Sequence, residues 1–167
     1  MKDLSKRGHG NLCLCTCRCV SSFDACGANW LECRVQRLIR SDEDIRRAAN
    51  AWCCDLKTAK TKYGPISEWI MYGVTNTSRL FEGKRNFNSN ISRWNVANVT
   101  DMNFMFAGAK SFNQPLNSWN VANVSSMSGM FYGASSFNQP LDSWNVANVT
   151  DMSCMFEGAK RETQWRR

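Results

Sequence analysis

The side chains best suited to chemistry in this sequence are its cysteines, which gather near the N-terminus. Four of them alternate with other residues: Cys13, Cys15, Cys17 and Cys19. Thiolate sulfur suits zinc or copper(I), so this C-x-C-x-C-x-C run is a candidate metal cluster. The competing interpretation is a leader outside the folded domain, because zinc frameworks usually contain C-x2-C pairs. The chain has nine cysteines, and an odd count leaves at least one thiol without an intramolecular partner.

The rest of the sequence lacks the residue sets of catalysis. The single histidine, His9, lies in the same N-terminal stretch, so no Ser-His-Asp or Cys-His arrangement is available further on. No G-x-x-x-x-G-K-[ST] phosphate loop occurs. Asp101 and Asp151 recur at one position of a repeat, where helix capping explains them. We therefore expect a protein that is not an enzyme, with no catalytic residues and no cofactor.

The net charge of +7 comes from the two ends of the chain. From Phe87 to Lys160 three basic residues face four acidic ones, so this stretch is close to neutral. Basic ends make nucleic-acid binding an alternative function, although charges on tails and on a helix face are usually solvated. No stretch approaches the roughly 20 apolar residues of a membrane span. The apolar run after Lys6 and Arg7 is short and broken by Arg18, unlike a convincing signal peptide.

A repeated sequence of 25 residues organises the rest of the chain. Residues 112–136 read FNQPLNSWNVANVSSMSGMFYGASS, and residues 137–161 match them at 18 of 25 positions. Looser copies occupy 87–111 and 62–86. A unit this short cannot bury its own core, so such units stack and share one. The sequence predicts four stacked coils, the first of them degenerate.

Each unit divides into two predicted elements. Polar and apolar residues alternate in Ser-Trp-Asn-Val, which predicts a short half-buried strand paired in parallel with its copies. A helix of one to two turns is predicted next by the spacing of Met102, Met105, Phe106 and Ala109. Columns of Trp, Val, Met and Phe should fill the core. The backbone of each coil should accept hydrogen bonds from stacked asparagines, which are Asn98, Asn123 and Asn148.

These signals divide the chain into four parts. Residues 1–40 are a Cys-rich basic leader, predicted to be disordered. Ser41 begins a capping helix, assigned to 41–61 with its helical turns over 42–60, which would cover the apolar end of the stack. The four repeats fill 62–161, and 162–167 form an uncapped tail. We expect the last coil to be exposed and to allow self-association. We also expect the sequence to be a fragment of a longer array.

The phrase W-N-V-A-N-V-T-D-M-x-x-M-F-x-G-A-x-x-F-N-Q-P-L resembles the BspA-like surface-protein repeat, a divergent leucine-rich-repeat family also described for mycoplasma lipoproteins. The helix with A-x-W, followed by Y-G-P-I-S-E-W, resembles the entry segment of such arrays, so the likeness covers residues 42–160. It implies an α/β solenoid of leucine-rich-repeat-like coils, each a short parallel strand plus a short helix. It also implies extracellular or cell-surface location and a role in adhesion or protein–protein contact, without catalytic residues.

A binding module is the function that these patterns favour, with an unknown protein or glycan as partner. Its binding face should lie on the solvent side of the predicted strands, at Arg93, Asn95, Ser118, Asn120, Ser143 and Asn145. Solenoids bind partners on such surfaces. Nucleic-acid binding through the basic ends and metal binding by the cysteine run are the alternatives.

Overall fold

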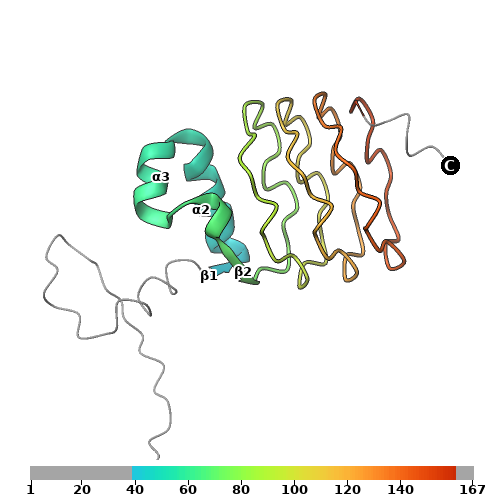
Figure 1. Ribbon diagram of the computed structural model, residues 1–167, viewed down its shortest axis with the longest axis horizontal. Coiled ribbons are helices and arrows are strands. Elements are labelled where there is room, and N and C mark those ends of the chain that lie inside the picture. The colour runs from blue at the N-terminus through green and yellow to red at the C-terminus, as the bar shows by residue number, and fades with distance from the viewer. Residues whose placement is uncertain (1–38, 161–167) are drawn as a thin grey trace, which may run out of the picture.

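The computed structural model describes residues 39–160 of the chain (Figure 1). Its elements in chain order are β1 (Ile39–Ser41), α2 (Asp42–Cys54), α3 (Leu56–Tyr63), the 3-10 helix η1 (Ile66–Glu68) and β2 (Ile70–Gly73). Residues 74–160 contain turns and isolated bridges, and they form coils that lie side by side in Figure 1. The predicted leader lies outside the described residues, apart from its last two positions, as does the tail 162–167.

Two helices close the N-terminal end of the stack, where the sequence predicts one. Ser41 Oγ accepts a hydrogen bond from Asp44 N at 3.3 Å, and α2 begins with three acidic residues in its first turn, as the helix dipole favours. The predicted helix is interrupted at Asp55, which ends α2. The Oδ1 atom of Asp55 then caps α3 by accepting from Thr58 N at 3.1 Å. We call α2 and α3 together the helical lid.

The helical lid is tied to the first coil by polar and aromatic contacts. Arg46 donates to Ser78 O at 2.6 Å and to Asn76 Oδ1 at 2.7 Å. The Trp52 ring meets the Trp69 ring edge to face, with centroids 5.9 Å apart. The apolar side of α2 therefore packs on the stack, and its buried members are Ile45, Ala48, Ala49 and Trp52.

Backbone hydrogen bonds join each coil to the next in register. Phe81 N donates to Met105 O at 2.9 Å, and the same bond recurs one and two units later from Phe106 N and Phe131 N, at 2.9 and 2.8 Å. Parallel bridges mark the register at a single column, made by Asn76, Asp101, Ser126 and Asp151. These bonds hold the four coils in one continuous stack.

The helix predicted over 102–109 is a series of turns instead. Alternate N–H groups close turns within the coil, such as Met105 N to Met102 O at 3.2 Å. The N–H groups between them donate to the next coil, as Phe104 N does to Ser128 O at 2.9 Å. Phe104 and Gly108 have φ values of 54° and 67°, which interrupt a right-handed helix. The apolar spacing is real, but inter-coil bonds consume the donors that a helix needs.

The strand predicted in each unit is regular only in the first coil of the described chain, where it is β2. There β1 pairs with it in parallel, with Ile39 opposite Ile70. In the next coil Asn95 takes the place of Ile70, and its Oδ1 accepts from Ala97 N at 3.1 Å. Asn120 and Asn145 do the same one and two units later. Such an asparagine turn bends the backbone out of the extended conformation.

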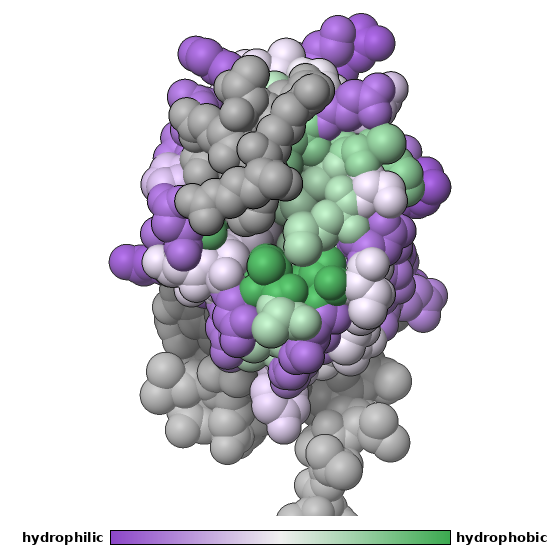
Figure 2. Space-filling view, turned by 90° about the vertical axis from the view of Figure 1, so that its right-hand side faces the viewer, coloured by the Kyte–Doolittle hydropathy of each residue, from purple (hydrophilic) through white to green (hydrophobic). Residues whose placement is uncertain are grey.

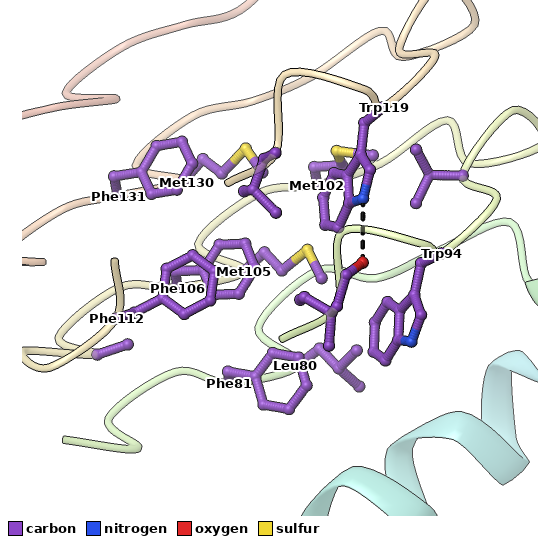
Figure 3. Close-up of a cluster of buried hydrophobic side chains, with 14 of the residues drawn as sticks. Leu80, Phe81, Trp94, Met102, Met105, Phe106, Phe112, Trp119, Met130 and Phe131 are labelled. Carbon is purple, nitrogen blue, oxygen red and sulfur yellow. Dashed lines mark hydrogen bonds between the residues drawn. The ribbon is translucent and has the colours of Figure 1, made fainter. Parts of the chain in front are cut away.

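Columns of like side chains fill the core, as predicted (Figure 3). The four Phe rings of one column, Phe81, Phe106, Phe131 and Phe156, have successive centroids 5.7, 5.5 and 5.5 Å apart. The Trp column is buried too, and Trp119 Nε1 donates to Ile91 O at 3.2 Å, the dashed line of Figure 3. Each indole therefore packs and also satisfies a buried carbonyl.

The asparagine prediction is confirmed. Asn98, Asn123 and Asn148 each donate through Nδ2 to a carbonyl of the preceding coil, at 3.0, 2.8 and 2.7 Å. These bonds add a polar column to the inter-coil backbone bonds.

The last coil is covered by another described coil on one side only. Met152 is 37% exposed, whereas Met127 in the same column is 0% exposed. Figure 2 faces this end and shows apolar atoms gathered on it. The exposure expected for the fourth coil is thus seen at Met152.

Candidate interaction surface

The six residues predicted to form the binding face are all exposed. They occupy turns rather than the solvent side of strands, which corrects the geometry of the prediction. Buried Trp side chains follow Arg93, Ser118 and Ser143 directly in sequence and hold these turns against the core. The predicted face is therefore a set of rows running across the coils, anchored from below by the Trp column.

The asparagines of these rows present one kind of polar group. Asn95, Asn120 and Asn145 each use Oδ1 to accept a hydrogen bond from the N–H two residues on. Within residues 39–160 their Nδ2 groups have no hydrogen-bond partner. The chain thus offers three amide donors at the same position of three consecutive coils.

The two serines of the prediction are engaged in joining coils. Ser118 Oγ donates to Ser92 O at 3.0 Å, and Ser143 Oγ accepts from Asn117 Nδ2 at 3.1 Å. Their hydroxyls are less available to a partner for that reason. The guanidinium of Arg93, by contrast, has no ionic or hydrogen-bonding partner in the described part of the chain. It is the cation of the face.

Two apolar side chains extend the rows into the first coil. Ile70 stands one repeat unit before Asn95, and Tyr72 stands one unit before Ala97. Tyr72 is 77% exposed and Ile70 is 37% exposed, and both belong to β2. Carrying the register of the repeat back by one unit would have identified them. We define the interaction row as Ile70, Tyr72, Arg93, Asn95, Asn120 and Asn145.

The partly buried ring of Phe104 is used within the molecule. The Arg79 guanidinium lies 4.8 Å from the centroid of this ring, and Arg79 Nη1 contacts the Glu82 carboxylate at 2.9 Å. Neighbours in the stack therefore satisfy the Arg79 side chain on both sides. We therefore interpret the contacts of Arg79 with Phe104 and Glu82 as stabilising the stack and not as a binding site.

Residues 39–160 contain no group of three or more His, Cys, Asp or Glu side chains that could hold a metal ion. Cys13, Cys15, Cys17 and Cys19 lie outside the described residues, so the cysteine run stays a prediction. Three thiols that the structure does describe are free: Cys53, Cys54 and Cys154. Burial raises the pKa of Cys53, and a hydrogen bond with Glu157 raises the pKa of Cys154, which disfavours the reactive thiolate form.

No helix among residues 39–160 has the length and apolar character to cross a membrane. Most of the basic residues proposed for nucleic-acid contact lie in the leader or the tail, outside the described range. The described residues therefore provide no geometric support for nucleic-acid binding.

These features define a repeat protein of stacked 25-residue coils, closed at one end by helices. The family described as "Mycoplasma protein of unknown function, DUF285" matches residues 54–165, and the chain belongs to this family. The matched region includes α3 and all the described coils. No curated protein and no solved structure matches the chain.

Proposed function

We propose that the chain is a non-catalytic binding module of the BspA-like surface-repeat type, a leucine-rich-repeat-like solenoid that acts in adhesion or protein–protein contact. The observation that carries the proposal is the interaction row. It places three amide donors at the same position of successive coils, and the first coil adds Ile70 at that position and, two residues further on, Tyr72, which is 77% exposed. The proposed binding site is this row of turns, which the buried Trp side chains hold in place.

The stack makes this row a pre-ordered surface. Backbone bonds, asparagine bonds and ring columns hold every coil to its neighbours. A partner that binds such a surface costs the protein little conformational freedom, so more of the contact energy remains as affinity. The regular spacing of equivalent donors favours a ligand with repeating acceptors.

The chemistry of the row favours a polypeptide partner. Amide Nδ2 groups at Asn95, Asn120 and Asn145 can donate to the carbonyls of an extended chain. Tyr72 and Ile70 supply apolar contact at one end, and tyrosine is enriched at protein interfaces. The single cation of the row, Arg93, can pair with one carboxylate. Because each contact is weak, useful affinity requires several contacts or several copies acting together.

The test separates the row from the rest of the surface. The full chain would be screened against a displayed random-peptide library and against a glycan array, and the selected ligands would be titrated. One variant would carry Asn95→Asp, Asn120→Asp and Asn145→Asp, which keep an oxygen for each turn and remove the outward donor. A second would carry Tyr72→Ser. The matched control is Tyr132→Ser, which alters an exposed tyrosine (45%) at another position of the unit.

We expect selected peptides to bind the parent and the Tyr132→Ser control equally. Both row variants should weaken binding by about tenfold or more, which corresponds to roughly 1.4 kcal/mol. Ligands that bind all four proteins alike would place the site elsewhere, and an absence of selected ligands would contradict the binding-module proposal. Selection of glycans alone would replace the polypeptide partner with a carbohydrate.

A further inference from the structure

We propose that a row of basic side chains, repeated along one turn of the coils, binds a sulfated polysaccharide. We call it the basic row and define it by Lys84, Arg85, Lys110, Ser135 and Lys160. The last four stand at one position of the repeat, each 25 residues after the one before. The basic row is separate from the interaction row, so the inference does not rest on the proposed function.

The same tight turn presents these residues in successive coils. Arg85 N and Lys110 N each donate to the glycine carbonyl two residues before, at 2.9 Å, and Ser135 N does so at 3.0 Å. Bonds between coils keep the turns in register, because Arg85 O accepts from Ser111 N at 2.9 Å and Lys110 O accepts from Ser136 N at 3.2 Å. The row therefore crosses the coils at their spacing, which is 5.5 to 5.7 Å in the Phe column.

The cations of the basic row are free of ion pairs. Several arginines elsewhere are engaged, as in the contacts of Arg79 with Glu82 at 2.9 Å and of Arg47 with Glu43 at 3.0 Å. The four cations of the row have no side-chain partner among residues 39–160. Stacking in register thus places like charges beside one another and leaves them available to an anionic ligand.

No acidic residue interrupts the basic row. Asp and Glu are absent from its turns, which are residues 84–86, 109–111, 134–136 and 159–160. The acids nearest in sequence are engaged, Glu82 with Arg79 and Glu157 with Cys154. Residues 39–160 contain twelve basic and ten acidic side chains, so acids are in excess once the four cations of the row are set aside. The row therefore concentrates positive charge on an otherwise slightly acidic part of the chain.

Lys84 extends the row to the helical lid. Burial raises the pKa of Cys53 in α2, and the positive charge of Lys84 partly opposes that rise. Lys84 therefore lies close to the end of α2, beside Arg85. The same end of α2 is fixed to the stack by Trp52, whose Nε1 donates to Ser89 Oγ at 2.9 Å. The basic row thus runs from the lid along the coils.

Exposed hydroxyl groups accompany the cations. Ser111, Ser135 and Ser136 are exposed, and their hydroxyls have no hydrogen-bond partner in the described part of the chain. Cations pair with anionic groups, and serine hydroxyls can donate to and accept from sugar hydroxyls. A sulfated polysaccharide carries sulfate and hydroxyl groups together, so it matches both kinds of side chain in the row.

Single-stranded nucleic acid matches the basic row less well. Proteins bind it by combining a basic groove with aromatic rings on which successive bases stack. Among residues 39–160 the exposed aromatic side chains are Tyr72 and Tyr132. Tyr72 belongs to the interaction row, and Tyr132 has Ala107 and Glu157 at its position in the adjacent coils. Charge and hydroxyls without a column of exposed rings favour the sulfated glycan.

The experiment titrates a fluorescein-labelled heparin oligosaccharide with the full chain and follows fluorescence anisotropy over a range of salt concentrations. The basic-row variant carries Arg85→Gln and Lys110→Gln, which keep exposed polar side chains. The matched control carries Arg47→Gln and Lys62→Gln, which remove the same charge from exposed positions of the helical lid. A desulfated oligosaccharide and a single-stranded oligothymidylate are titrated in parallel.

We expect heparin to bind the parent and the control alike, and the basic-row variant at least about tenfold more weakly. The slope of log affinity against log salt should become shallower by about one for each cation removed. Peptides selected for the interaction row should bind the basic-row variant as they bind the parent, so the two proposals fail separately.

Several results would overturn the proposal. Absence of heparin binding would do so directly. Equal losses in both variants would reduce the effect to net charge, and equal binding by all three proteins would assign it to cations outside the row. Undiminished binding of the desulfated sugar would remove the role of the sulfates. Oligothymidylate that binds more tightly than heparin through Arg85 and Lys110 would make nucleic acid the ligand.

Discussion

The aromatic ring of Phe104 lies directly over Gly129, the residue at the same position of the next unit. A Cβ atom on Gly129 would stand 2.3 Å from Phe104 Cε1 and 2.5 Å from Cδ1. Both residues have positive φ values, 54° and 58°, as do Arg79 and Cys154 at the same position of their units. Phe104 and Gly129 therefore depend on each other, because the Phe104 ring fits only where the next unit has no side chain.

Gly129→Ala should destabilise the fold by two separate effects. Its left-handed backbone conformation costs an alanine about 1–2 kcal/mol, and the collision with the Phe104 ring adds about 1–3 kcal/mol. Gly83→Ala is the matched control, because Gly83 has φ of 68° and nothing within 4 Å of an added Cβ. Urea unfolding should rank the two variants, and Phe104→Ala should relieve part of the Gly129→Ala loss. Equal losses at Gly83 and Gly129 would contradict the contact.

Met127→Ala and Met152→Ala should differ although both residues occupy one column. Met127 is fully buried, so its truncation leaves a cavity and should cost about 2–5 kcal/mol. Met152 is 37% exposed, so the same truncation should cost less than about half as much. Chemical denaturation of the two variants checks this. Similar losses would mean that the last coil is as well covered as the third.

Asn123→Asp should destabilise the fold, whereas Asn120→Asp should leave its stability nearly unchanged, although the two positions lie in one short segment. Asn123 donates through Nδ2 to Ala97 O at 2.8 Å, and an aspartate there would set a carboxylate against a carbonyl. We expect a loss of about 1–2 kcal/mol near neutral pH. Asn120 accepts through Oδ1 from Ala122 N, and a carboxylate can also accept, so its variant should change stability by no more than about 0.5 kcal/mol. Thermal unfolding of the pair distinguishes the two roles, and equal losses would refute them.

Asp42 should make the junction between the helical lid and the first coil sensitive to acid. Burial acts to raise its pKa, but hydrogen bonds from Asn76 N and Thr75 N, the Thr75 hydroxyl and the nearby Arg46 outweigh that effect and lower it. A carboxyl whose folded pKa lies below its unfolded value stabilises the fold above the unfolded value. That stabilisation is lost as the pH falls through the folded pKa.

Asp42→Asn should therefore flatten the stability profile between about pH 5 and pH 2. The variant keeps an oxygen that can accept from Thr75 N, so the lid should still form at neutral pH. Asp55 and Asp151 also have lowered pKa values, through hydrogen bonds to Thr58 and Ser153 respectively. Their contribution remains in both proteins, and the difference between the two profiles isolates Asp42. Parallel profiles would exclude it as the cause.

The inter-coil core was predictable because the repeat constrains it. When Trp, Met and Phe recur once in every unit, stacking the units in register buries like against like. The bonds of Asn98, Asn123 and Asn148 followed from the same register. What the sequence pattern misjudged was the local conformation between these columns. At 102–109 the helical spacing of apolar residues is present, but N–H groups bond to the next coil, a pairing that no single unit contains.

The interaction row shows the same division at the surface. The exposure of Asn95, Asn120 and Asn145 could be foreseen from alternation with buried residues. That their oxygen closes a turn, leaving the amide nitrogen outward, depends on the backbone bending at that point. Tyr72 does not follow from the asparagine pattern, because the first unit is the most degenerate copy and has Ile70 where the later units have an asparagine.

The sequence by itself determined the number of coils, the residues that face the core and the helical start at Ser41. These depend on period, hydrophobicity and capping, which are local or regularly repeated properties of the chain. Only the tertiary structure decided that the coils are joined turns instead of strand–helix pairs, that the Asn120 oxygen closes a turn, and that Phe104 rests on Gly129. Each of these depends on which neighbour receives a given N–H group or ring, and that neighbour lies in the same bent segment for Asn120 and in the adjacent unit of the stack for the other two.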